Sequence, residues 1–299
     1  MDIRAILMGV AFAAMWSSAF TSARIIVAEA PPIYALALRF LLSGAIAVGL
    51  AAWLGQSWRL TASQWRATLV FGICQNALYL GLNFVAMQTV EASLAAIIAS
   101  TLPLLVALAG LLFFGERQRL MSVAGLVAGF AGVALIMGSR FGGGVDGFGI
   151  LLCIGGVIAL TVATLALRNA SSGGNLLMVV GLQMLVGSAA LWPFAILLEV
   201  PVVTISGPLI AAFAYTTLVP GLAATLVWFM LVGRVGAVRA AAFHFLNPFF
   251  GVAIAALLLG ETFGILDAVG VTIIGLGILA VQLSRKSYAN SSEKTHRRV

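Results

Sequence analysis

Charged residues are scarce in this chain. Its 299 residues include 16 Lys and Arg and 9 Asp and Glu, so charge makes up 8% of the sequence and hydrophobic residues make up 62%. A soluble globular domain carries about 25% charged residues. The composition therefore excludes a soluble globular enzyme and predicts an all-α integral membrane protein.

Cysteine is equally rare, and the patterns that mark several kinds of active site are missing from the sequence. Cys74 and Cys153 both lie in apolar segments, which predicts two core residues and not a disulfide framework or a metal site. The sequence has no GxxxxGK[ST] loop for ATP and no HExxH motif for zinc. We therefore expect no catalytic residues, no metal, no cofactor and no enzymatic activity.

Ten apolar segments are long enough, at about 20 residues each, to cross a bilayer. Pro, Gly or charged residues separate them, and they are apolar on all sides. The predicted spans are 4–27, 33–54, 66–88, 92–114, 120–138, 147–168, 176–198, 207–231, 239–259 and 264–284. The first could instead be a signal peptide ending at Ala30, but the repeat described below needs it as a span.

The basic residues predict the orientation, because Lys and Arg are retained on the cytoplasmic side of a membrane. With both termini in the cytoplasm, the outer loops hold only Arg24 and Arg140, and Arg39 lies inside the second span. The inner residues are Arg4, Arg59, Arg66, Arg117, Arg119, Arg168, Arg234, Arg239, Arg285, Lys286, Lys294, Arg297 and Arg298. The basic tail 285–299 follows an apolar span, which favours binding to lipid headgroups over nucleic acid.

The second half of the chain repeats the first at a shift of 145 residues. The aligned identities include Pro103 with Pro248, Gly115-Glu116 with Gly260-Glu261, Gly125 with Gly270, and Gly132 with Gly277. Each half holds five predicted spans, and an odd number makes the second half enter the membrane in the opposite sense. We predict one repeat at 1–139, an inverted repeat at 147–284, and the cytoplasmic tail 285–299. Inverted repeats are characteristic of secondary transporters, with a site between the halves.

Three features of the sequence carry a family resemblance: Trp16-Ser17-Ser18-Ala19-Phe20, Ala37-Leu38-Arg39-Phe40, and the paired prolines followed by Gly-Glu. Over about residues 4–284 the chain resembles the EamA branch of the drug/metabolite transporter superfamily. Within that branch it is most similar to bacterial exporters of aromatic and other neutral amino acids. The resemblance implies a ten-helix bundle in the bacterial cytoplasmic (inner) membrane, alternating access and export of a metabolite.

Two prolines predict breaks in the fourth and ninth spans. Pro103 and Pro248 cannot donate a backbone hydrogen bond, which leaves a carbonyl without its helical partner at membrane depth. Such breaks either shape packing or line a transport site. Polar residues beside them favour a site: Ser100 and Thr101 near Pro103, and His244 and Asn247 near Pro248.

Polar and aromatic residues in other spans are further candidates for substrate binding. Gln75, Tyr79 and Asn83 follow at i, i+4 and i+8 and share one helix face, where they either hydrogen-bond between helices or line a cavity. The remaining candidates are Trp16 and Phe20 in the first span, Thr161 and Thr164 in the sixth, and Trp228 at the repeat position of Asn83. Together they suit a substrate with an apolar side chain and a small polar head.

The titratable residues of the spans narrow the substrate class. His244 is the only histidine in a predicted span, and three roles stay open for it: proton coupling, hydrogen bonding to substrate, or packing. Arg39 is interpreted as structural, with its side chain reaching toward the outer interface. Glutamates stand at predicted span ends and not at their centres, which disfavours transport of cationic drugs; these are Glu29, Glu91, Glu116, Glu199 and Glu261.

The leading hypothesis is a secondary-active or facilitative exporter of aromatic and other neutral amino acids and related small metabolites. A broad drug or metabolite exporter is the alternative, and a lipid flippase is a further one. The expected partners are a small-molecule substrate and membrane lipid. A single chain holds both halves of the repeat, which favours a monomer.

Overall fold

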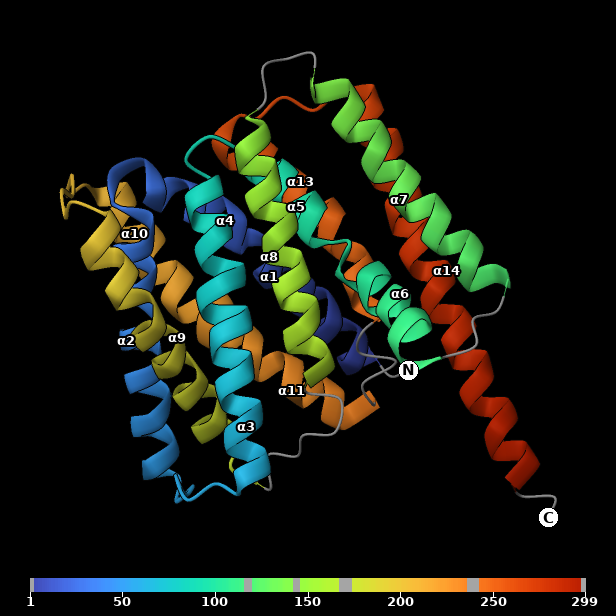
Figure 1. The fold of residues 1–299 in the computed structure, drawn as a ribbon, viewed down its shortest axis with the longest axis horizontal. Coiled ribbons are helices and arrows are strands. Elements are labelled where there is room, and N and C mark those ends of the chain that lie inside the picture. Colours follow the sequence, from blue (N-terminus) through green and yellow to red (C-terminus); the bar gives the residue numbers. More distant parts are fainter. Residues whose placement is uncertain (1–2, 116–119, 142–145, 167–173, 236–241, 297–299) are drawn as a thin grey trace.

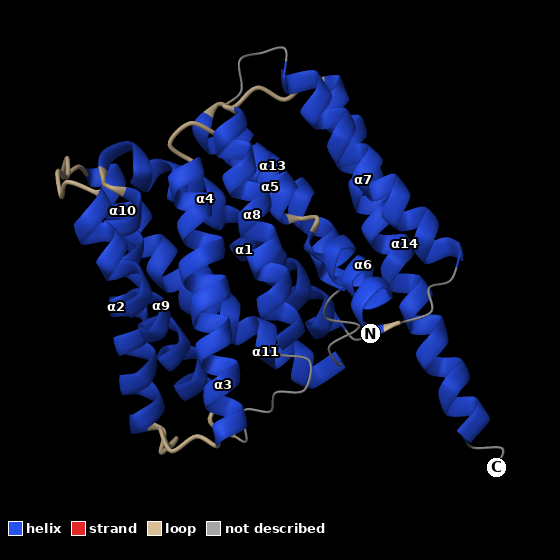
Figure 2. Ribbon diagram, in the orientation of Figure 1, coloured by secondary structure: helices blue, strands red, loops and turns tan. Residues whose placement is uncertain are grey.

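The computed structural model describes residues 3–115, 120–141, 146–166, 174–235 and 242–296, and within these ranges the chain forms helices and no strand (Figure 2). The first part of the chain contains α1 (Ile3–Glu29), α2 (Pro32–Trp53), α3 (Ala62–Phe71), the π-helix η1 (Gly72–Tyr79), α4 (Leu80–Ala86), α5 (Ala92–Ala99), α6 (Leu102–Phe114) and α7 (Leu120–Phe141). The second part contains α8 (Gly147–Ala166), α9 (Leu176–Leu198), α10 (Gly207–Thr216), the π-helix η2 (Thr217–Ala223), α11 (Ala224–Val235), the 3₁₀ helix η3 (Ala242–Leu246), α13 (Asn247–Leu259) and α14 (Ile265–His296).

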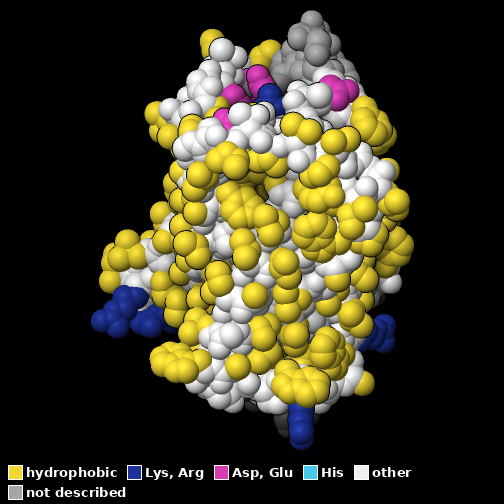
Figure 3. Space-filling model, turned by 90° about the vertical axis from the view of Figure 1, so that its left-hand side faces the viewer, with side chains coloured by type: hydrophobic (Ala, Val, Ile, Leu, Met, Phe, Trp, Pro, Cys, Tyr) yellow, Lys and Arg dark blue, Asp and Glu magenta, His cyan; other side chains and the backbone are white. Residues whose placement is uncertain are grey.

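The length and composition of these helices fit a bilayer. Among the described residues, the helical runs long and apolar enough to cross a membrane are Ile3–Glu29, Pro32–Trp53, Ala62–Ala86, Ala92–Phe113, Gly147–Ala166, Leu176–Leu198 and Gly207–Trp228. Shorter apolar helices cover Leu120–Ile136, Asn247–Leu259 and Ile265–Val281. Figure 3 shows hydrophobic side chains over the sides of the molecule, acidic ones at its upper end and most of the visible Lys and Arg toward its lower end. The chain is therefore a multi-pass helical membrane protein.

Some sequence predictions fall where the structure is not described. Glu116, Arg117, Arg119, Arg168, Arg239, Arg297 and Arg298 lie outside the described residues, as do the side chains of Arg140, Arg285, Lys286 and Lys294. The backbone of α14 continues helical to His296, beyond the predicted end of the last span.

The element boundaries of the two parts correspond at the shift of 145 residues. Shifting α6 by 145 gives 247–259, which are the bounds of α13. Shifting α2 gives 177–198, one residue shorter than α9. Both π-helices also begin at equivalent positions, Gly72 and Thr217.

Equivalent helices pack against one another in two long pairs, α2 with α9 and α7 with α14. In Figure 1, α2 lies at one edge of the bundle and the α7/α14 pair at the other. Glycines bring α7 and α14 close together, because a Cβ on Gly277 would lie 2.6 Å from the carbonyl oxygen of Gly125 and one on Gly132 would lie 2.9 Å from that of Gly270. These glycines therefore serve close packing within one chain.

Two glutamates connect the ends of helices that are distant in sequence. Glu199, which follows α9, accepts hydrogen bonds from the backbone N–H groups of Ile33 and Tyr34 at the start of α2, at 2.9 and 2.8 Å. Glu261, which follows α13, accepts from Ala92 and Ser93 at the start of α5, at 2.8 and 2.9 Å. A carboxylate at a helix N-terminus satisfies free donors and complements the helix dipole.

Candidate functional site

The third predicted span is one continuous helix, α3-η1-α4, whose central part is a π-helix, and α10-η2-α11 repeats this construction. π-helical segments alter the regular hydrogen-bond ladder and are frequent at functional sites. In η2, Pro220 has no N–H to offer the carbonyl of Thr216 four residues earlier. The guanidinium of Arg39 on α2 donates to that oxygen, with its Nε 3.2 Å away.

A cavity of about 50 Å³ lies between these π-helices and α1, α2 and α9, and is here termed the central cavity. It is lined by Trp16, Ala19, Phe20, Ala23, Arg39, Phe40, Gln75, Asn76, Tyr79, Leu80, Asn83, Phe84, Met87, Met184, Pro220, Gly221 and Thr225. Aromatic, aliphatic and amide side chains dominate the lining. It includes one cation and, among the described residues, no carboxylate.

Both parts of the chain contribute equivalent positions to the central cavity. The pairs related by 145 residues are Arg39 and Met184, Gln75 and Pro220, Asn76 and Gly221, and Leu80 and Thr225. The cavity therefore lies where the two equivalent sets of helices meet, although the side chains that the two sets supply are chemically different.

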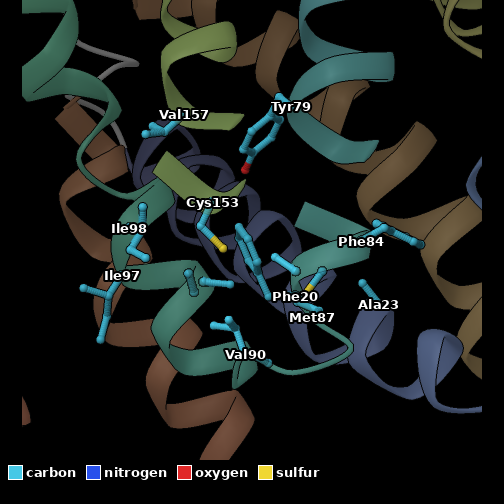
Figure 4. Close-up of a cluster of buried hydrophobic side chains, with 14 of the residues drawn as sticks. Phe20, Ala23, Tyr79, Phe84, Met87, Val90, Ile97, Ile98, Cys153 and Val157 are labelled. Atoms are coloured by element: carbon cyan, nitrogen blue, oxygen red, sulfur yellow. The ribbon is translucent and has the colours of Figure 1, made fainter. Parts of the chain in front are cut away.

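Five of the predicted substrate-binding residues line this cavity: Trp16, Phe20, Gln75, Tyr79 and Asn83. The polar face predicted for the third span thus faces the bundle interior. The close-up in Figure 4 shows Tyr79 reaching from its helix with the hydroxyl directed toward Cys153, close to Phe20. Tyr79 is 1% exposed, so its ring is enclosed by protein and not by lipid.

Asn83 is a buried polar residue that uses the nitrogen of its side-chain amide but not the oxygen. Its amide nitrogen donates to the backbone carbonyl of Tyr79 at 2.8 Å. Its side-chain oxygen is buried and has no hydrogen-bond partner in the described part of the chain. Asn76, one turn from Tyr79 on the same helix, instead donates to the carbonyl of Gln183 at 2.9 Å and so ties η1 to α9.

Four predicted residues hydrogen-bond to their own helix, and none of them is among the described residues that line the central cavity. Ser100 donates to Ala96, Thr101 to Ile98, Thr161 to Val157 and Thr164 to Leu160, at 2.7 to 2.8 Å. Ser100 and Thr101 separate α5 from α6, and Pro103 stands in the first turn after this interruption. Pro248 likewise stands in the first turn of α13, after η3.

His244, Asn247 and Trp228 form a second group, which contacts the first through Phe12. The side-chain nitrogen of Asn247 lies 3.0 Å from Nδ1 of His244. The His244 ring packs edge-on against Phe12 and Trp228, with centroid distances of 5.3 and 5.1 Å. Phe12 in turn lies 5.8 Å from the Trp16 ring at the cavity wall. None of the three predicted residues is among the described residues that line the cavity.

The side chain of Arg39 does not lie where the sequence predicted. It was expected to reach toward the membrane interface, but its side chain is 4% exposed and lines the central cavity beside Gly221. The available signal was that Arg39 is the one Lys or Arg that the charge distribution assigns to neither the inner nor the outer side.

A larger opening lies next to the central cavity and is here termed the vestibule. It has a volume of about 610 Å³ and is lined by Arg24, Ile25, Val27, Ala28, Glu29, Gln88, Glu91, Leu259, Gly260, Glu261 and Thr262. Ala23 and Met87 line the central cavity, whereas their neighbours Arg24 and Gln88 line the vestibule. The guanidinium of Arg24 donates to the carbonyl of Met87 at this boundary.

Comparison with known proteins identifies similar transporters. The family model described as the EamA-like transporter family matches residues 3–138 and again residues 147–283. An uncharacterized transporter, YvbV, of Bacillus subtilis is 27% identical over 91% of this chain and 90% of its own length. A chloroplastic WAT1-related protein of Arabidopsis thaliana is 23% identical over 89% of this chain and 66% of its own length.

The arrangement of helices is also found in a solved structure. One crystal structure matches 96% of this chain and 99% of its own chain with a TM-score of 0.66 and 24% sequence identity. This likeness shows the fold.

Proposed function

Since the chain belongs to the EamA-like transporter family of the drug/metabolite transporter superfamily, we propose that it exports aromatic and other neutral amino acids and related small metabolites across a bacterial cytoplasmic membrane. The substrate crosses chemically unchanged. Transport is secondary-active or facilitative and uses a site in the central cavity.

The lining of the central cavity carries this proposal. Trp16, Phe20 and Tyr79 offer apolar faces, and Gln75 and Asn83 offer neutral hydrogen-bonding groups. An apolar wall with a few placed polar groups suits a small molecule with an apolar side chain and a polar head. A cationic drug would lack a counterion there, because the described lining includes no carboxylate.

The same proposal includes ten spans in two inverted halves, with both termini in the cytoplasm. The equivalence of α6 with α13 at a shift of 145 residues supports the repeat, as does the separate match of the family model to each half. The distribution of Lys and Arg supports the orientation, because only Arg24 and Arg140 fall in the outer loops. In this orientation the vestibule opens to the outside.

The size of the central cavity supports alternating access. Its 50 Å³ is far below the volume of about 300 to 1,000 Å³ typical of small-molecule sites. The halves must therefore separate around the cavity to admit a substrate. We place the outer closure at the hydrogen bond from Arg24 to Met87, which lies between the cavity and the vestibule.

The test is uptake of labelled phenylalanine, methionine, threonine, lysine and glutamate by purified protein in liposomes. We expect saturable uptake of the neutral amino acids, reduced by unlabelled competitor, and at least about tenfold lower uptake in Asn83→Ala and Tyr79→Ala. Trp58→Ala is the matched aromatic control, because Trp58 is 64% exposed at the surface. Absence of uptake of every amino acid by folded protein contradicts the proposal.

A broad drug or metabolite exporter is the second candidate. Phe40, Phe84, Met87 and Met184 give the cavity an adaptable apolar wall, and methionine accommodates ligands of varied shape. Inhibition of phenylalanine uptake by apolar compounds unrelated to amino acids would favour this candidate.

A further inference from the structure

Arg39 is a buried cation with no acidic partner among the described residues. Its side chain is 4% exposed, and within the described structure its contacts are a hydrogen bond from Nε to the carbonyl of Thr216 and the face of Phe40, 5.1 Å from the guanidinium carbon. Arginine stays protonated in proteins, and a buried charge is costly unless it is paired. A neutral carbonyl and an aromatic ring compensate this charge only in part.

The bond to Thr216 orients the guanidinium. Pro220 cannot donate to that carbonyl, and the oxygen accepts a hydrogen bond from Nε of Arg39. The two terminal amino groups make no hydrogen bond to another described residue. Gly221 leaves space beside them, since a Cβ at that position would stand 3.4 Å from Nη2. The fork of the guanidinium is thereby fixed at the wall of the central cavity, where a carboxylate binds such a fork with two parallel hydrogen bonds.

Asn83 offers the complementary group in the same cavity. Its nitrogen is committed to the carbonyl of Tyr79, which accepts only a donor, so the orientation of the amide is determined. The oxygen of Asn83 is therefore an acceptor, and it is buried and unpartnered. An ammonium group satisfies such an acceptor.

We propose that Arg39 binds the carboxylate of the substrate and that the side-chain oxygen of Asn83 accepts a hydrogen bond from its ammonium group, which defines the substrate as a zwitterionic amino acid with a single carboxylate. This inference rests on the proposed function and specifies the chemistry of the same site. The position equivalent to Arg39 is Met184, which also lines the cavity. The cavity thus has one anion-binding side and one apolar side, and a second carboxylate on the substrate finds no second cation in its described lining.

The experiment compares competitors of labelled phenylalanine uptake in proteoliposomes. Phenylalaninol lacks the carboxylate, 3-phenylpropionate lacks the ammonium, and both keep the aromatic side chain. We expect each to compete roughly 10- to 100-fold more weakly than phenylalanine, because each leaves a buried group of the site unpaired. This measurement needs only the wild-type protein.

Arg39→Gln supplies the second measurement. We expect it to lower phenylalanine uptake at least about tenfold and to bring phenylalanine and phenylalaninol to similar competition strength. Arg66→Gln is the matched control, because Arg66 is exposed on α3. Equal competition by phenylalanine and phenylalaninol in the wild-type protein overturns the role of Arg39 while amino-acid transport stands. Absence of phenylalanine uptake overturns both proposals.

Discussion

The guanidinium of Arg24 donates a hydrogen bond to the backbone carbonyl of Met87, and this contact joins the end of α1 to the segment that follows α4. Met87 itself is 1% exposed and lines the central cavity. On the other side of the contact, the vestibule holds Glu29, Glu91 and Glu261. The contact thus lies at the boundary between the central cavity and the charged vestibule.

The first prediction is that Arg24→Gln opens this boundary. The substitution Ala19→Cys places a thiol on the cavity wall, and its rate of labelling measures how readily a reagent enters the cavity. Cys74 and Cys153 are replaced by alanine so that they do not react. We expect an impermeant thiol reagent added from the vestibule side to label Ala19→Cys roughly tenfold faster in Arg24→Gln, because a charge-assisted hydrogen bond is lost. Arg66→Gln, far from the boundary, is the control. Equal labelling rates with Arg24 and with Gln would show that this bond does not close the cavity.

The second prediction concerns the α7/α14 pair. Gly277→Ala places a methyl group 2.6 Å from the carbonyl oxygen of Gly125, so one helix must shift. We expect a loss of about 1 to 3 kcal/mol in stability. Gly138→Ala is the matched control on α7, because a Cβ there meets nothing within 4 Å and alanine favours a helix.

Thermal unfolding in detergent micelles measures the stability of both glycine variants. The melting temperature should fall in Gly277→Ala and stay level or rise in Gly138→Ala. Similar melting temperatures would contradict the close packing of α7 on α14.

The course of the helices could be predicted because apolar segments and their interruptions are local features of a sequence. The polar face of Gln75, Tyr79 and Asn83 could also be predicted from the sequence, since helical periodicity places these residues together and lipid cannot satisfy their hydrogen-bonding groups. The structure places all three at the central cavity.

Arg39 shows where sequence reasoning stopped. Whether an embedded arginine extends to the interface or turns inward depends on the acceptors within its reach. Its acceptor is the carbonyl of Thr216, 177 residues away, just before the π-helix that contains Pro220. Long-range pairing of this kind leaves no periodic trace in the sequence.

The third prediction uses Asp146, in the segment before α8. The hydroxyl of Thr89 donates to its carboxylate at 2.6 Å, and the N–H of Phe148 donates at 3.0 Å. The hydrogen bond from Thr89, and next those from the Phe148 and Gly149 backbone, lower the pKa of Asp146 below its ordinary value of 3.8.

Because the folded protein has the lower pKa, this group stabilises the fold above the ordinary pKa. That stabilisation is lost as the pH falls through the folded value. We expect Asp146→Asn to reduce the stability difference between neutral and acidic pH, measured as melting temperature across the acidic range. An unchanged pH dependence in this variant would contradict a contribution from Asp146.

The last prediction addresses His244. Its Nδ1 accepts from the amide nitrogen of Asn247, and the amide oxygen of Asn247 is buried without a partner. A proton on Nδ1 would need an acceptor, and rotation of the Asn247 amide by half a turn supplies that oxygen. Protonation would also place a charge between Phe12 and Trp228, next to the ring of Trp16 at the cavity wall.

We therefore expect a pH gradient to stimulate phenylalanine uptake by the wild-type protein. His244→Gln should retain uptake without a gradient and lose the stimulation, since glutamine keeps a hydrogen-bonding group but does not titrate. Asn83→Leu, which alters the cavity wall, should lower uptake under both conditions. Stimulation that persists in His244→Gln would assign coupling to another group, and a wild-type protein indifferent to the gradient would make transport facilitative.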